Sequence, residues 1–80
     1  MMTENSNEYI TSLKSTLNAE DFRTLKEINI RKLQDSFDDY MKAKQYMLDH
    51  SLQNDAPAFA GHIDKRLITI QEFILTWQDA

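Results

Sequence analysis

Residues 56–77 read APAFAGHIDKRLITIQEFILTW and carry the most regular apolar pattern in the chain. Apolar residues recur there at alternating intervals of four and three, at Ala56, Ala60, Ile63, Leu67, Ile70, Ile74 and Trp77. This spacing holds one stripe on one side of an α-helix and is typical of the seam between paired helices. We therefore predict a helix over residues 57–78 that packs lengthwise on another helix.

The partner helix is predicted immediately upstream, because residues 21–53 contain neither glycine nor proline. Projected at about 100° per residue, their large apolar side chains fall in one arc of about 180°. They are Phe22, Leu25, Ile30, Leu33, Phe37, Tyr40, Met41, Met47, Leu48 and Leu52. One long helix over 21–53 is the simplest prediction, and a kink near Asn29, a poor helix former, is the alternative. Residues 54–57 should form the hairpin turn, since Pro57 suits the first turn of a helix.

A shorter helix is predicted over residues 8–17, where Tyr9, Ile10, Leu13 and Leu17 share one face. Asn18 is placed to cap the N-terminus of the long helix. We expect residues 1–7 to be a disordered tail and residues 8–80 to be a single all-α domain. The short helix could cover the part of the long helix that the third helix does not reach. If the long helix kinks, a conventional three-helix bundle would form instead.

The composition excludes several classes of protein. The 80 residues include one glycine and one proline, too few for the turns of an all-β fold, and no cysteine for disulfides or thiolate chemistry. No apolar run approaches the about 18 residues of a membrane span, so we expect a cytoplasmic protein. The net charge of −4 disfavours nucleic acid. The bases Arg23, Lys26, Arg31 and Lys32 are interleaved with acids, which also argues against a nucleic-acid surface.

No pattern of residues indicates catalysis or a cofactor. His50 and His62 bracket the turn among several aspartates, but their spacing matches no ordinary metal motif. Residues 35–39 hold the only acidic cluster, which lies off the apolar stripe and should be solvated. The sequence therefore predicts no catalytic, cofactor-binding or metal-binding residue.

The residues that suggest a partner are apolar. Side chains on both sides of the seam widen the apolar arc of the third helix to about 220°, more than one helix can cover. Together with two residues outside the stripe of the long helix, the predicted partner-binding set is Phe59, Ile68, Phe73, Leu75, Trp77, Ile28 and Tyr46. The partner could be a second copy or another protein. Alternatively, the first helix could cover all of them in a compact monomer.

These features predict a non-enzymatic regulator, adaptor or chaperone that acts by helix–helix association. In shape, the hairpin of about residues 33–78 with its Asn54–Pro57 turn resembles the needle subunits of type III secretion and the small helical chaperones that hold them. No secretion-type motif flanks the turn, and small helical bacteriophage proteins fit equally well. The alternative function is therefore a structural subunit of a larger assembly, such as a secretion apparatus or a phage.

Overall fold

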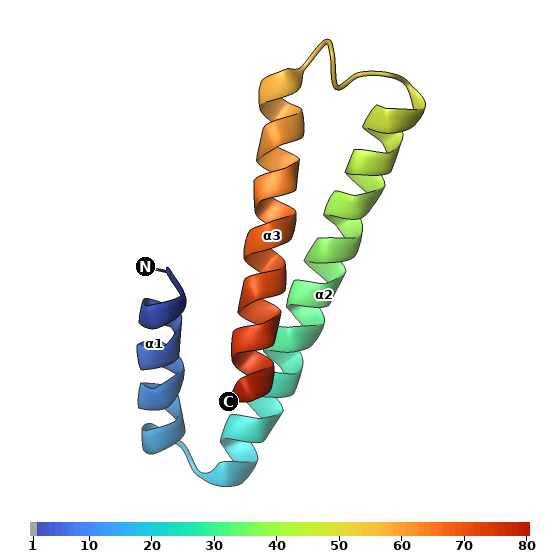
Figure 1. Ribbon diagram of the computed structural model, residues 1–80. Coiled ribbons are helices and arrows are strands. Elements are labelled where there is room, and N and C mark those ends of the chain that lie inside the picture. The colour runs from blue at the N-terminus through green and yellow to red at the C-terminus, as the bar shows by residue number, and fades with distance from the viewer. Residues whose placement is uncertain (1) are drawn as a thin grey trace.

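The computed structural model describes residues 2–80, and the side chains from Glu8 onward. It contains three helices, α1 (Met2–Thr16), α2 (Ala19–Asp49) and α3 (Pro57–Asp79), and no strand within the described residues. Helices α2 and α3 form a long antiparallel hairpin, and α1 folds back beside the open end of that hairpin (Figure 1). The predicted all-α fold with a short first helix and a helical hairpin is confirmed.

Helix α1 begins earlier than the sequence indicated. Its backbone is helical from Met2, whereas a helix from Glu8 behind a disordered tail was expected. The segment contains no glycine or proline, so a helix nucleated further along can extend through it at little cost. Met1, the remaining residue of the predicted tail, lies outside the described residues.

Helix α2 starts at a cap that the sequence predicts. The Asn18 Oδ1 atom accepts a hydrogen bond of 2.8 Å from the Asp21 backbone N–H, and the Asn18 amide donates to the Asp21 carboxylate at 3.1 Å. Because Asn18 is the cap, the helix begins at Ala19, two residues before the predicted start. It then continues through Asn29 as one helix of 31 residues, about 46 Å long.

Helix α2 ends at Asp49, four residues before the predicted end, in a Schellman motif. Ser51 adopts a left-handed conformation with φ of 55°, and its N–H donates to the Leu48 carbonyl at 3.2 Å. The Leu52 N–H reaches back to the Met47 carbonyl at 2.8 Å, and Leu52 packs on the cluster that contains Met47. These bonds satisfy carbonyls at the end of the helix and turn the chain toward α3.

Replacing Ser51 by glycine should raise the free energy of unfolding by about 0.5–1 kcal/mol. The left-handed conformation costs an L-residue about 1–2 kcal/mol, and the greater backbone entropy of unfolded glycine offsets part of that gain. Chemical denaturation followed by circular dichroism measures the change. The control is Ser51→Ala, which removes the hydroxyl but keeps the strained φ and should not stabilise. Equal effects of the two substitutions would contradict the backbone explanation.

Two hydrophobic clusters hold the three helices together. The upper cluster, near the hairpin turn, has Met47, Ile63 and Leu67 at its centre. The lower cluster joins all three helices through Ile10, Phe22 and Trp77. Ile70 is buried on the same side of α3. The predicted seam of α3 is therefore the side that faces the rest of the protein, although Ile74 is only half-buried.

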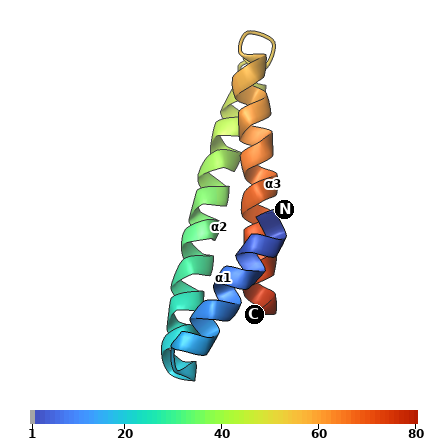
Figure 2. The ribbon, with the colours of Figure 1, turned by 90° about the vertical axis from the view of Figure 1, so that its left-hand side faces the viewer.

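Helix α3 covers more of α2 than was expected. The Trp77 and Phe22 rings are stacked with centroids 6.3 Å apart, so α3 reaches the first turn of α2. Helices α1 and α3 therefore do not cover two successive parts of α2. Instead, α1 lies across one face of the hairpin in its lower half and packs more extensively on α3 than on α2 (Figure 2). Within residues 2–80, no helix covers the opposite face of the hairpin.

Candidate interaction surface

The structure separates the seven predicted partner-binding residues instead of bringing them together. Ile68 and Leu75 lie on one side of α3, with exposed fractions of 59% and 54%. Ile28 and Tyr46 are exposed on the side of α2 that points away from α3, and Phe59 is exposed near the turn. Phe73 and Trp77 differ from these five because other parts of the chain cover them.

Trp77 belongs to the core of the monomer. Its side chain is only 8% exposed to solvent and packs with Ile10 of α1 and Phe22 of α2. Two cationic side chains close the same end: the Lys14 ammonium donates to the Ala80 carbonyl at 3.1 Å, and the Lys26 ammonium donates to the Gln78 carbonyl at 3.3 Å. In this structure Trp77 is thus a docking point for α1 and is not available to a partner.

Phe73 is half-buried in the groove that α2 and α3 form on the side of α1. With Leu33, Tyr40, Arg66 and neighbouring residues it lines a shallow cavity of about 230 Å³. This groove continues toward the turn past His62, whose ring lies against both Tyr40 and Phe59. Aromatic rings already occupy much of this side, so Phe73 adds little free apolar area.

The opposite side of the hairpin carries the clearest exposed apolar surface. An ion pair of 3.1 Å between Lys44 of α2 and Asp64 of α3 marks where the two helices border this side. At about 100° per residue, Met41 and Leu48 lie within about 60° of Lys44. On α3, Ile68 and Leu75 lie within about 40° of Asp64, on the side of Asp64 that is further from the seam. We call the surface formed by Met41, Leu48, Ile68 and Leu75 the open face.

The four side chains of the open face are between 43% and 59% exposed. They form one stripe on each helix, with a spacing of seven residues between Met41 and Leu48 and between Ile68 and Leu75. A spacing of seven is the repeat with which helices pack on one another. The open face therefore has the pattern of a second helix-packing seam, offset from the seam that closes the hairpin.

Sequence reasoning placed Met41 and Leu48 in the core and so omitted them from the predicted surface. The sequence signal that could have identified them is their offset of about 80–100° from Tyr40 and Met47, which places them at the edge of the arc. A single partner helix covers only the middle of a 180° arc. The outer residues stay exposed for that reason.

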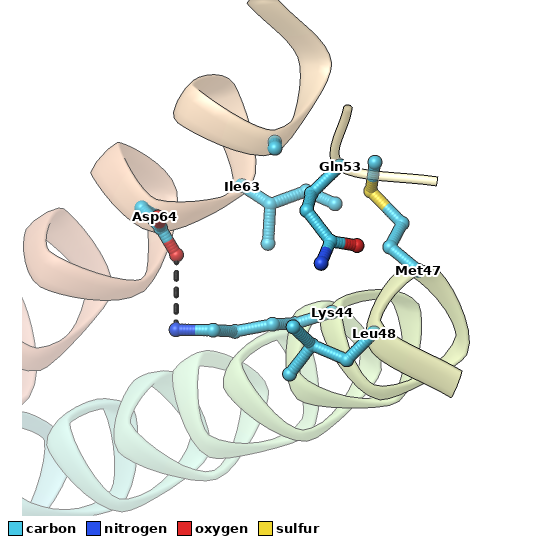
Figure 3. A pocket seen from close by; sticks show the side chains of 7 residues that line it. Lys44, Met47, Leu48, Gln53, Ile63 and Asp64 are labelled. Atoms are coloured by element: carbon cyan, nitrogen blue, oxygen red, sulfur yellow. Dashed lines mark ion pairs between the residues drawn. The ribbon is translucent and has the colours of Figure 1, made fainter. Parts of the chain in front are cut away.

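A small cavity lies at the upper end of the open face, where Lys44, Leu48 and Asp64 meet Gln53 (Figure 3). Its volume is about 210 Å³, and Ile63 forms part of its wall. The Gln53 side chain points into this space, and its Oε1 atom is buried without a hydrogen-bond partner among the described side chains. A buried carbonyl oxygen of this kind leaves room for a donor from outside the chain.

The polar side chains considered as catalytic or metal-binding candidates are exposed. His50 stacks on Tyr46 with ring centroids 4.1 Å apart, and its Nδ1 atom lies 3.0 Å from the Tyr46 carbonyl oxygen. Asp35, Asp38 and Asp39 are exposed on α2. In the part of the chain that the structure describes, no three metal-ligating side chains gather at one point.

Comparisons with protein-family models, with curated proteins and with solved structures each find no match to this chain. Within residues 2–80, none of the helices combines the length and the apolar character needed to cross a membrane. The function is therefore argued from the surface of the molecule itself.

Proposed function

We propose that the protein is a non-enzymatic interaction module that acts by helix–helix association through the open face. The observation that supports this proposal is the grouping of four large apolar side chains on the one side of the hairpin that α1 does not cover. Single exposed apolar residues are common on monomers, whereas a contiguous stripe over two helices is typical of a binding surface. The helical spacing favours a helical partner.

The charges around the open face support the same proposal. The Lys44–Asp64 ion pair is exposed on both partners, so it contributes little to stability. Because the two charges neutralise each other, covering this surface buries no net charge.

Site-specific photocrosslinking in the native host tests the proposal. A photoreactive phenylalanine analogue in place of Ile68 should give covalent adducts, because this position lies at the centre of the open face. The matched control places the same analogue at Arg66, which is exposed on α3 but lines the groove on the other side of the hairpin. An adduct of defined mass at position 68 and not at position 66 is the expected result. Absence of adducts at 68, or equal adducts at both positions, would contradict the proposal.

The size of the adducts separates a regulator or adaptor from a structural subunit. One discrete adduct corresponds to a single partner. A ladder of adducts at regular mass intervals would correspond to a subunit of a polymer.

A further inference from the structure

The chain exposes more surface than a compact protein of its mass. Its solvent-accessible surface is 5994 Å², whereas a folded monomer of 9.4 kDa has about 5,000 Å². Its radius of gyration is 15.7 Å against about 12 Å for a compact domain of this length. The excess surface of about 1,000 Å² is comparable to the about 800 Å² that each partner buries in a standard interface.

The shape of the molecule indicates where this excess lies. The principal extents are 49 × 24 × 14 Å, so the hairpin is a thin layer with two broad faces. Helix α1 covers part of one face, and the other is the open face (Figure 2). Only seven apolar residues of the described side chains are buried, a small core for a chain of 80 residues. Chains of this size commonly gain the missing burial by oligomerisation.

We infer that the open face is a homodimer interface and that the occupant that covers it is a second copy of this chain. The inference rests on the proposed function and names its partner. A twofold axis parallel to the helices would place α2 of one copy on α3 of the other, antiparallel and face to face. The hairpins then form a four-helix bundle with both α1 helices on the outside.

Gly61 is consistent with a partner helix on the open face. It lies seven residues before Ile68 and therefore on the same stripe. A Cβ atom added there would meet nothing within 4 Å, so packing inside the chain does not require glycine. The bare backbone at this position would allow a neighbouring helix to approach closely.

Sedimentation equilibrium of the full chain tests the inference. We expect twice the 9.4 kDa chain mass at about 100 μM. Ile68→Glu places a charge at the centre of the interface and should raise the dimer dissociation constant by about 100-fold or more. Its helicity by circular dichroism should be unchanged, because Ile68 is 59% exposed in the monomer. If this variant loses helicity, Leu75→Glu, on the same stripe, replaces it in the test.

The matched control is Ile28→Glu, which makes the same change at a 46% exposed position on the far side of α2. It should leave the dimer intact.

Two results would overturn the inference: a monomer at every concentration, or a dimer that Ile28→Glu dissociates and Ile68→Glu does not. A purified monomer that still crosslinks through position 68 to a different protein in the host would refute the dimer and leave the proposed function standing. A monomer without crosslinks at position 68 would refute both.

Discussion

Replacing Ile63 by alanine should lower the free energy of unfolding by about 2–5 kcal/mol. Ile63 is fully buried, with 0% exposure, at the centre of the upper cluster between Met47 and Leu67. Removing three carbon atoms from the core loses the favourable free energy of their burial. It also leaves a cavity, because the two helices cannot move together far enough to fill it. A domain of this size has about 5 kcal/mol or little more of total stability. Urea denaturation at low temperature, followed by circular dichroism, measures the loss.

The control for this substitution is Ile28→Ala. Ile28 is also in a helix, but it is 46% exposed, so the same truncation should change stability by about 0.5 kcal/mol or less. Comparable losses at the two positions would show that Ile63 is not at the centre of the core. Both proteins should be compared at one concentration, because a dimer makes stability depend on concentration.

The seam of α3 was predictable because its spacing is strict and its helix has one principal neighbour. Ile63, Leu67, Ile70 and Trp77 are all buried, as the four–three pattern indicates. The start of α2 was predictable for a different reason. Asn18 can cap the helix by a hydrogen bond within its own segment, so its role does not depend on the rest of the fold.

The end of α2 was not predictable from its local sequence. No glycine or proline stands between His50 and Ala56, and the left-handed residue is a serine, which has no special preference for that conformation. The chain turns there because Leu52 packs back on the upper cluster. That contact depends on tertiary structure.

The candidate surface was predictable only in part. The excess width of the α3 stripe identified Ile68 and Leu75, both of which are on the open face. The projection of α2 placed Met41 and Leu48 with the core, because a helical wheel does not show how much of an arc a neighbour covers. It also gave no information on where α1 would dock. Trp77 was assigned to the partner surface for that reason, although α1 buries it.

Replacing Trp77 by alanine should cost about 3–5 kcal/mol and should act mainly on α1. The Trp77 side chain packs against both Ile10 and Phe22, so its loss removes the centre of the cluster that joins the three helices. Helix α1 has 15 residues, near the limit at which an isolated helix is marginal in water. Once undocked it should unfold, and the protein should lose about a fifth of its helical signal.

Amide hydrogen exchange distinguishes local from global destabilisation in the Trp77→Ala variant. Trp77 is not part of the upper cluster of Met47, Ile63 and Leu67. Amides near these three residues should therefore keep most of their protection from exchange. Amides of residues 10–16 should lose theirs. Ile28→Ala serves as the control, since Ile28 is 46% exposed and lies on the side of α2 that points away from α3. If protection falls equally along the whole chain, the two clusters form one cooperative unit and α1 is not a separable element.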